Sequence, residues 1–406
     1  MKSPSKRFTA FLATFVLLAL GPVAAQAALY QAITIPASNV SGDLTDYPVY
    51  VDLSSLDQQF RDQATAGDIS VEPAGGGAAL PHELVSLDST GGELHFLAPN
   101  VSSTTDTSYE IHWGAGHVGP GNSTAVWGNY AGVWHLQDAV GDPQGAADST
   151  ANGNNSTTAQ GIVDAGAVGI MGNAFDTSTS KISRMDIGVG TNMNPASLTI
   201  EMWTNFTTDL ELFPTFNRDW GFYRRAQSGF GGGPGWFDLI ASLTNGGPGT
   251  SLPPGTVYFQ FDDGGCCGVV KSTTLVDDGE WHHLLATIND DTDEAKLYID
   301  GVEEDSTTAS SWTPATTTDL DNGFFNQSAG DGSSFAPDGR SDEIRYRAGV
   351  LSGAEVAAQY LNQRHPGEFY LVGPVVPEPS TMILAAMGAA VLLGSAARRG
   401  LGKPAP

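Results

Sequence analysis

Alternating apolar and polar residues predict short β-strands over the first third of the chain. The clearest stretch is 47–53 (Tyr-Pro-Val-Tyr-Val-Asp-Leu), in which every second side chain is apolar and would share one face of a strand. Further short strands are expected at 68–71, 93–97 and 109–113, separated by turns rich in Gly, Pro, Asp and Ser. This pattern is typical of a small β-sandwich, which we place at residues 28–127.

The same alternation continues over residues 131–368 and predicts a larger β-sandwich. One strand is expected at 198–206, and residues 281–288 and 295–301 form a predicted hairpin around an acidic turn. One short helix begins at the capping box of Ser352 and Glu355. Its expected buried side consists of Val356, Tyr360 and Leu361.

The first 27 residues have the order of an export signal. Three positive residues (Lys2, Lys6 and Arg7) precede the apolar run 8–20, and Ala25-Gln26-Ala27 supplies the small residues of a cleavage site. The alternative is an uncleaved membrane anchor, but the run is shorter than the roughly 20 residues that a spanning helix needs.

The C-terminal end has the order of a stop-transfer segment. Pro377-Glu378-Pro379 is followed by the apolar stretch 381–397, a predicted transmembrane helix, and then by Arg398-Arg399. These three parts in this order, over residues 376–399, resemble the PEP-CTERM sorting signal. The resemblance implies a Gram-negative bacterium, processing by an exosortase, and an inner-membrane intermediate that then reaches the cell surface or extracellular matrix. A permanent single-span anchor is the alternative, and residues 369–375 are expected to be a linker.

The charge of the exported part excludes one class of partner. Residues 28–376 hold 12 basic and 44 acidic residues, whereas the whole chain has a formal charge of −27. Such a surface repels phosphate backbones, so we expect no binding to nucleic acid. The acidity suits solubility outside the cell, and it would also attract divalent cations.

Two family resemblances follow the two predicted sandwiches. Residues 40–49, 68–69, 80–83 and 109–114 resemble a bacterial domain of unknown function that commonly precedes lectin-like modules. The larger segment resembles the LamG-like, concanavalin-A-type jelly roll of bacterial surface proteins, and its matching pieces are 133–136, 148–154, 197–203, 279–283, 297–301, 341–345 and 351–356. The second resemblance implies recognition of carbohydrate, matrix or protein, and such domains often hold calcium.

Calcium is the metal cofactor that the acidic loops suggest, since it prefers several carboxylate and carbonyl oxygens. The positions to test first are Asp148, Asn152, Asn154 and Asp342. The alternative is that these residues are solvated turn residues and caps.

An aromatic, glycine-rich insert at 213–249 is the predicted recognition surface, because sugar rings have apolar faces and hydroxyl edges. Its named candidates are Trp220, Tyr223, Arg224 and Trp236. The alternative is that these aromatic residues pack the sandwich. Cys266 and Cys267 are adjacent, and export favours a strained vicinal disulfide between them over intermolecular pairing.

The sequence predicts an all-β protein that acts as a non-catalytic recognition module, with a glycan or exopolysaccharide as its ligand. One alternative is a polysaccharide-degrading glycoside hydrolase, although the E-x-D-x-x-E strand of laminarinase-like enzymes is absent from 131–368. The other alternative is a structural adhesin or matrix protein that binds other proteins.

Overall fold

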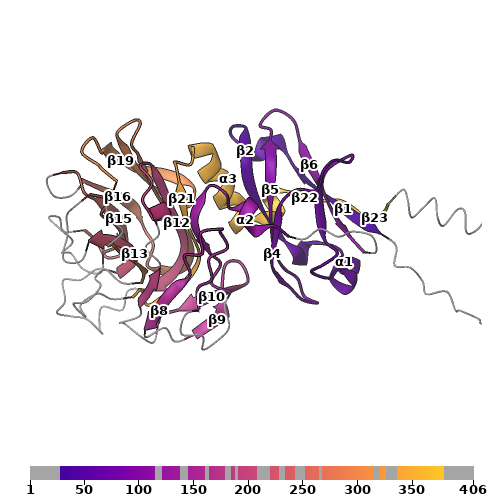
Figure 1. The fold of residues 1–406 in the computed structure, drawn as a ribbon, viewed down its shortest axis with the longest axis horizontal. Coiled ribbons are helices and arrows are strands. Elements are labelled where there is room, and N and C mark those ends of the chain that lie inside the picture. The colour runs from indigo at the N-terminus through magenta and orange to yellow at the C-terminus, as the bar shows by residue number, and fades with distance from the viewer. Residues whose placement is uncertain are drawn as a thin grey trace, which may run out of the picture.

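The computed structural model describes residues 28–114, 121–137, 145–160, 164–178, 184–187, 191–207, 220–227, 234–242, 252–264, 268–314, 320–325 and 336–378. Two β-sandwiches lie side by side, with the helix α3 (Gly353–Arg364) between them, as Figure 1 shows. The predicted export signal at 1–27 and the predicted transmembrane helix at 381–397 lie outside these residues. Within them, no helix is long and apolar enough to cross a bilayer.

The N-terminal sandwich consists of two antiparallel sheets. The order of the first sheet is β22-β1-β6-β3, with β23 also paired to β1, and the order of the second is β2-β5-β4. Its elements are β1 (Leu29–Ile35), β2 (Leu44–Asp52), α1 (Gln58–Gln63), β3 (Ser70–Pro73), β4 (His82–Leu87), β5 (Gly92–Val101), β6 (Thr107–Trp113), α2 (Ser123–Val126), β22 (Leu371–Val372) and β23 (Val376–Pro377).

Apolar side chains from both sheets form the core of this small sandwich. Val49 and Val51 of β2 are fully buried with Phe96 of β5 and Ile111 of β6. The alternation at 47–53 thus identified a real strand, because one face of that strand meets the opposite sheet.

The segment 369–375 is part of the N-terminal sandwich, which corrects its interpretation as a linker. Phe369 and Tyr370 are 0% and 1% exposed and belong to the N-terminal core. β22 then pairs with β1 through Ile33 and Val372. An unpaired strand edge presents open N–H and C=O groups, and the returning chain satisfies those of β1.

The larger sandwich packs two antiparallel sheets face to face. Within the described residues, the first sheet has the order β19-β18-β17-β12-β21-β10-β9, with β7 beside β21, and the second has the order β16-β15-β14-β13-β20-β11-β8. Its strands are β7 (Tyr130–Trp134), β8 (Ser156–Gln160), β9 (Asp164–Val168), β10 (Asn173–Asp176), β11 (Arg184–Ile187), β12 (Leu198–Thr207), β13 (Trp220–Gln227), β14 (Phe237–Ala241), β15 (Thr256–Phe261), β16 (Gly268–Leu275), β17 (Asp278–Asn289), β18 (Glu294–Ile299), β19 (Val302–Thr308), β20 (Leu320–Phe324) and β21 (Gly339–Ala348).

The core of this jelly roll lies between its two sheets. Leu198, Ile200 and Met202 of β12 face Phe237 and Leu239 of β14, and all five are fully buried in one apolar cluster. The predicted hairpin is confirmed, since β17 and β18 pair in antiparallel register. The predicted all-β class, a small sandwich followed by a jelly roll, is therefore confirmed.

One helix joins the two sandwiches. α3 (Gly353–Arg364) begins at the predicted capping box, in which Ser352 and Glu355 bond reciprocally, and α4 (Pro366–Phe369) follows. Val356 is buried as expected, but Tyr360 and Leu361 are only partly buried. The other buried positions of α3 are Ala358, Gln359, Asn362 and Gln363, because α3 lies between two protein surfaces instead of on one core.

Candidate functional site

A buried polar network lies between the two sandwiches, on the outward face of the jelly roll's first sheet. Along β21, Ile344 and Tyr346 point into the jelly-roll core, so Glu343 and Arg345 point away from it. Glu201 of β12 stands opposite Arg345 in register. Each of the three charged residues is at most 2% exposed, because the N-terminal sandwich covers this face.

Glu343 lies in a β-bulge. The register of β12 and β21 shifts between Glu201 and Trp203, and Glu343 has a φ of 48°. A non-glycine residue with positive φ is strained, and bulges commonly redirect a side chain. Here the bulge directs the Glu343 carboxylate toward His135, which follows β7 and precedes the left-handed Leu136 with a φ of 54°.

The N-terminal sandwich supplies the other half of the network. Glu93 and His95 are two residues apart on β5, so they share a face, and they are 1% and 0% exposed. Glu83 of β4 lies beside them and accepts hydrogen bonds from Ser149 Oγ and Trp127 Nε1.

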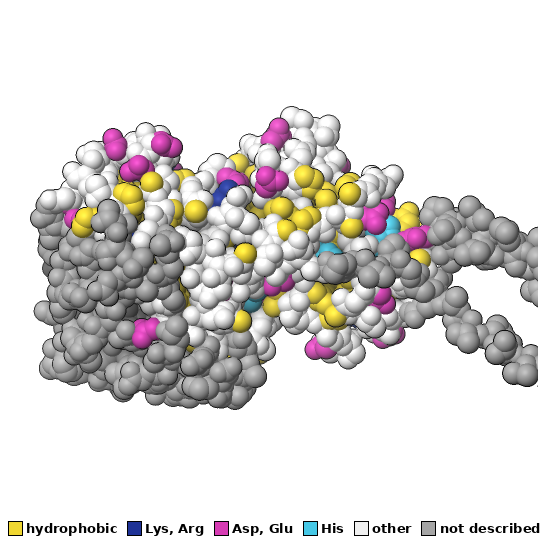
Figure 2. Space-filling model, in the orientation of Figure 1, with side chains coloured by type: hydrophobic (Ala, Val, Ile, Leu, Met, Phe, Trp, Pro, Cys, Tyr) yellow, Lys and Arg dark blue, Asp and Glu magenta, His cyan; other side chains and the backbone are white. Residues whose placement is uncertain are grey.

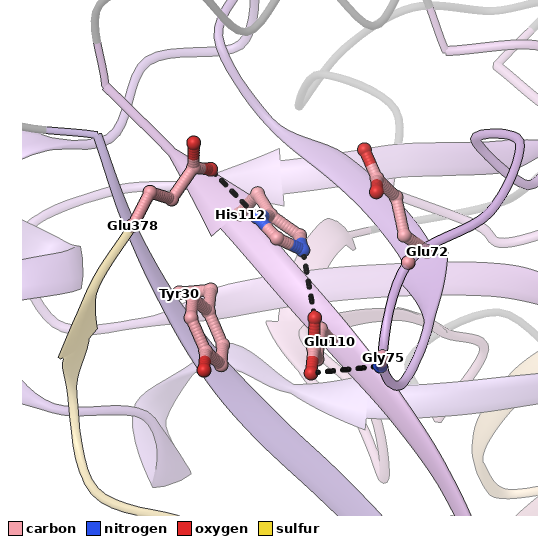
Figure 3. Close-up of a pocket in the computed structure, with 7 residues that line it drawn as sticks. Tyr30, Glu72, Gly75, Glu110, His112 and Glu378 are labelled. Carbon is pink, nitrogen blue, oxygen red and sulfur yellow. Dashed lines mark hydrogen bonds and ion pairs between the residues drawn. The ribbon is translucent and has the colours of Figure 1, made fainter. Parts of the chain in front are cut away.

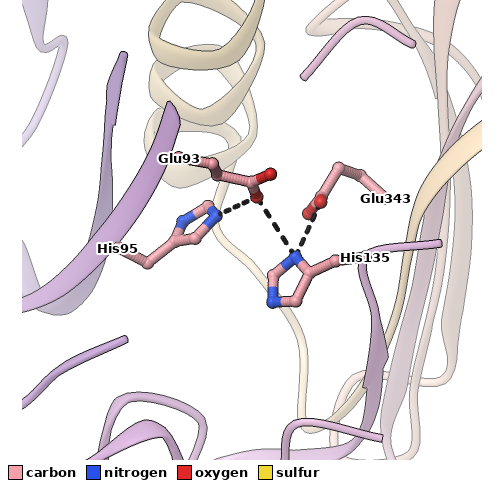
Figure 4. Close-up of side chains that lie close together, drawn as sticks. All are labelled: Glu93, His95, His135 and Glu343. Carbon is pink, nitrogen blue, oxygen red and sulfur yellow. Dashed lines mark hydrogen bonds and ion pairs between the residues drawn. The ribbon is translucent and has the colours of Figure 1, made fainter. Parts of the chain in front are cut away.

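His135 connects the two halves (Figure 4). Its Nδ1 lies 2.6 Å from Glu343 Oε1 and 3.3 Å from Glu93 Oε1. Its Nε2 lies 3.2 Å from Glu83 Oε2. His95 Nε2 lies 2.8 Å from the same Oε1 of Glu93. Two histidines and three carboxylates therefore meet at one buried point of the domain interface.

Arg345 balances part of this negative charge. Its Nη2 and Nε donate to Glu343 Oε2 at 2.7 and 3.2 Å, and its Nη1 lies 3.8 Å from Glu201 Oε1. The guanidinium also lies 5.0 Å from the ring centroid of Trp127, at cation–π distance.

α3 closes the interface with amide side chains. Asn362 accepts a hydrogen bond from the Tyr50 N–H and donates one to the Tyr50 C=O, each at 2.8 Å. Gln363 Oε1 accepts from Trp203 Nε1 at 2.5 Å. Asn362 thus binds the N-terminal sandwich and Gln363 binds the jelly roll, so the helix fixes one relative to the other.

The network favours the charged forms of Glu343, Glu83 and His135. Burial by itself would raise the pKa of Glu343, but the charges of His135 and Arg345 outweigh it and lower that pKa. Burial would likewise raise the pKa of Glu83, and His135 with its hydrogen bond lowers that pKa to about 2. Burial would lower the pKa of His135, but Glu343 and Glu83 raise it well above its ordinary value.

A pocket of about 430 Å³ lies at the other end of the N-terminal sandwich (Figure 3). It is lined by Tyr30, Glu72, Gly75, Gly76, Glu110, His112 and Glu378. Glu378, the central residue of the predicted sorting tripeptide, lies 2.8 Å from His112 Nδ1, and its N–H donates to the Ala28 C=O. β23, which includes Pro377, pairs with the start of β1. The start of the sorting tripeptide is thus docked beside the predicted N-terminus of the mature chain.

The predicted ligand-binding residues do not form one exposed surface. Tyr223 is 0% exposed and stacks on Phe237 in the jelly-roll core, with ring centroids 5.5 Å apart, so its ring is not available as a sugar platform. Trp236 is 4% exposed. Trp220 and Arg224 lie on β13, and their side chains are outside the described part of the structure.

Trp236 has polar neighbours on the outward face of the second jelly-roll sheet. Trp236 directly precedes β14 and is two residues from Asp238, so the two side chains lie on the same face. That face is opposite to the one that carries the core residues Phe237 and Leu239. Gln260 of β15 stands opposite Asp238 in register and donates to its carboxylate at 3.2 Å. Among the described atoms, Trp236 Nε1 and Gln260 Oε1 are buried without a hydrogen-bond partner.

The four predicted calcium ligands are only partly brought together. Asp148, Asn152 and Asn154 share one loop, but Asp148 accepts four hydrogen bonds from Val133, Thr150 and Asn154. The Asn152 and Asn154 amides donate to β7 carbonyl groups, so this loop is closed by its own bonds.

Asp342 lies elsewhere, where it accepts from the N–H groups of Ile170, Met171 and Glu343. Calcium binding at these four positions stays a prediction. Cys266, Cys267 and Pro379 lie outside the described residues, so the vicinal disulfide stays a prediction as well.

Sequence reasoning missed the interdomain network. Its residues come from β4, β5, β12, β21 and the position after β7, which are distant in sequence. The available signal was a pair of charged residues two apart in an otherwise apolar strand, as in Glu93 and His95 or Glu343 and Arg345. That spacing places both side chains on one face, and a charged face in a buried strand requires a partner surface.

Two family models match the chain. Residues 181–357 match the concanavalin A-like lectin/glucanases superfamily, and residues 375–399 match the PEP-CTERM protein-sorting motif. The predicted LamG-like domain and sorting signal are therefore confirmed. The motif indicates export and sorting to the surface of a Gram-negative cell. No curated protein matches the chain.

Several solved structures align with part of the chain. The binding domain of Paraclostridial Mosquitocidal Protein 1 aligns with a TM-score of 0.43 and 14% identity over 57% of this chain and 52% of its own. The botulinum neurotoxin serotype D binding domain aligns with a TM-score of 0.41 and 12% identity, over 58% of this chain and 52% of its own. The serotype D ligand-binding domain in complex with N-acetylneuraminic acid aligns with a TM-score of 0.40 and 15% identity, over 58% of this chain and 51% of its own. The chain thus spans about half the length of these structures, and the likeness carries no information on ligands.

Proposed function

We propose that this exported PEP-CTERM protein, with its concanavalin A-like jelly roll, is a non-catalytic module that binds carbohydrate at the cell surface or in the extracellular matrix. The observation that supports it most directly is the match of residues 181–357 to the concanavalin A-like lectin/glucanases superfamily. A polar and aromatic group of Trp236, Asp238 and Gln260 lies on the outward face of the second sheet, and these residues are 4%, 2% and 4% exposed. In that group, an indole N–H and an amide oxygen lack partners among the described atoms.

This combination suits sugar chemistry. Indole N–H and amide groups can bond sugar hydroxyls, and in this group those atoms are Trp236 Nε1 and Gln260 Oε1. A buried polar atom without a partner is costly, and a ligand hydroxyl would relieve that cost. On the first jelly-roll sheet the outward residues Glu201, Glu343 and Arg345 are buried at the domain interface, so we propose the second sheet as the binding face.

Binding is favoured over hydrolysis because the interdomain carboxylates are engaged in ion pairs. Glu93, Glu201 and Glu343 lie at the interface between the two sandwiches, where they pair with His95, Arg345 and His135. The acidic surface argues against nucleic acid as the ligand. In the view of Figure 2, Asp and Glu side chains are spread over the described surface, and Lys and Arg are scarce.

The test is a glycan array together with a reducing-sugar assay on the secreted chain. We expect retention of a glycan without new reducing ends. Gln260→Ala should weaken binding about five- to tenfold, the effect of losing roughly one hydrogen bond. Gln58→Ala, which removes an exposed amide on α1, is the matched control.

New reducing ends would support the hydrolase instead. Absence of glycan retention, combined with altered cell cohesion in a deletion strain, would support the structural adhesin.

We further propose that an exosortase processes the chain at Pro377-Glu378-Pro379 after an inner-membrane stage. Deleting these three residues should keep the full-length product in the membrane fraction, and cell fractionation with immunoblotting checks this. Release of the deleted form to the medium would contradict the proposal.

A further inference from the structure

The donor atoms of the interdomain network lie close enough together to surround one metal ion. Glu93, His95, His135 and Glu343 each offer one nitrogen or carboxylate oxygen, and these four atoms lie within 4.8 Å of one another. Figure 4 shows the two histidine rings and the two carboxylates pointing toward a common centre. Two ligands come from each sandwich, so a single ion would join them.

The spacing of these atoms is near that of a tetrahedral site. Zinc bonds to histidine and carboxylate of about 2.0–2.2 Å place neighbouring ligand atoms about 3.3–3.6 Å apart. His135 Nδ1 and Glu93 Oε1 are already 3.3 Å apart. His135 Nδ1 and Glu343 Oε1, at 2.6 Å, and His95 Nε2 and Glu93 Oε1, at 2.8 Å, would each have to separate by about 1 Å or less.

The hydrogen bond at the far side of His135 also fits a metal ligand. If Nε2 carries the proton and donates to Glu83, the Nδ1 lone pair faces the carboxylates of Glu343 and Glu93. A lone pair facing two anions is repulsive unless a proton or a cation lies between them. Metal-ligating histidines commonly donate their other N–H to a carboxylate, which fixes ring orientation and tautomer.

The charge balance favours a divalent cation over a proton alone. The network contains four carboxylates, those of Glu83, Glu93, Glu201 and Glu343. Arg345 pairs with Glu201 and Glu343, whereas Glu83 and Glu93 lie against His135, and Glu201 also lies against His283. A proton on His135 removes only one unit of the remaining negative charge. Buried charges are costly unless they are compensated, and a divalent ion compensates two of them.

We propose that Glu93, His95, His135 and Glu343 bind one divalent transition-metal ion, with zinc as the first candidate, and that this ion locks the two sandwiches together. Two imidazole nitrogens and two carboxylate oxygens are a donor set that zinc accepts. The ion is structural, because the site is closed to substrate. The proposal does not depend on carbohydrate binding.

The test starts with the full-length chain, freed of metal by a chelator and then dialysed against zinc. Elemental analysis should find about one zinc per chain, and zinc should raise the melting temperature. Cobalt should give the visible absorption of a tetrahedral site, a readout that requires no variant.

Variants then locate the ion. His135→Asn and Glu343→Gln should retain no zinc. Glu83→Gln should keep the stoichiometry but weaken zinc affinity about 10- to 100-fold, the usual effect of losing a partner of a ligating histidine. His282→Gln is the matched control, since His282 also lies between two carboxylates, Asp278 and Asp300, but outside the cluster.

Three results would each overturn the proposal. The first is wild-type protein that holds no zinc, shows no cobalt band and melts at the same temperature with and without metal. The second is equal zinc loss in His282→Gln. The third is zinc retention by His135→Asn and Glu343→Gln equal to that of the wild type, which would place the ion outside this cluster.

Discussion

At the scale of single residues, buried charge is the dominant feature of this molecule. Glu201, Glu343 and Arg345 lie under a domain interface at 2% exposure or less. A buried ion pair contributes little net stability, but breaking it by removing one partner leaves an uncompensated charge. The identity of each partner is therefore strongly constrained even though no substrate reaches it.

Arg345→Met should destabilise the protein by about 3–5 kcal/mol, because it removes the guanidinium charge that pairs with the buried Glu343 and Glu201. Urea denaturation followed by tryptophan fluorescence measures this change. Arg340→Met is the control: Arg340 is 42% exposed and 3.8 Å from Asp176, so its loss should cost less than about 1 kcal/mol. Equal effects of the two substitutions would contradict the assignment of buried charge.

His282 predicts a pH-dependent contribution to stability. Burial by itself lowers the pKa of His282, but the hydrogen bonds and charges of Asp300 and Asp278 outweigh it and raise that pKa above its ordinary value. A histidine whose pKa is higher in the folded state than in the unfolded state contributes its full stabilisation at pH values below the unfolded-state pKa. This contribution disappears as the pH rises through the folded-state pKa. His282→Gln should thus destabilise more at pH 5.5 than at pH 8.5.

Urea midpoints at the two pH values check this prediction. Asp300→Asn should reduce the pH dependence, since asparagine keeps an acceptor and tolerates the φ of 51° at that position. A His282→Gln effect that grows with pH would show that the sign is wrong.

At the scale of elements, the end of the described chain stabilises its beginning. α3 contacts both sandwiches through amide side chains, and β22 and β23 then pair with β1. Val376 and Pro377, at the start of the sorting motif, are consequently held in a strand.

Substituting His112 should loosen β23. His112→Ala removes the contact to Glu378, and the loss of about 1 kcal/mol should speed amide exchange of Glu378 about fivefold. Hydrogen exchange with mass spectrometry measures this rate. The Gly373 amide, bonded to the Ala32 C=O at 2.8 Å, is the internal control and should not change. Unchanged exchange at Glu378 would mean that backbone pairing alone holds it.

At the scale of the whole molecule, the two sandwiches are not independent units in series. The N-terminal core is completed by residues that follow the jelly roll in sequence, and the interface between them is filled by charged and amide side chains. The chain therefore runs from the N-terminal sandwich through the jelly roll and then back into the N-terminal sandwich.

Phe369→Ala should destabilise the N-terminal sandwich although it lies some 240 residues beyond that segment's predicted end at 127. Phe369 is fully buried there, and truncating a buried phenylalanine costs about 3–5 kcal/mol. Hydrogen exchange of β1 and β6 amides should increase. Leu371→Ala, at 59% exposure, is the neighbouring control and should have little effect. Equal exchange in both variants would place Phe369 outside the N-terminal core.

The alternation of apolar residues was sufficient to identify strands such as β2, β12, β17 and β18. The reason is that burial of one strand face requires an apolar residue at every second position, which is a local pattern in the sequence. The capping box of α3 is equally local, since Ser352 and Glu355 are three residues apart. The two ends of the chain could also be interpreted from sequence, because positive residues, an apolar run and the Pro-Glu-Pro tripeptide are contiguous.

Only the tertiary structure decided which polar residues meet. Glu93 and His135 are 42 positions apart, and Glu343 is more than 200 positions from both, so no spacing in the sequence joins them. Tyr223 is a second example. From sequence alone its aromatic ring could contact a sugar or pack in a core, and only the packed structure shows that it stacks on Phe237 in the core. Strand faces follow from local periodicity, whereas the pairing of one face with another depends on how the sheets and the returning chain pack.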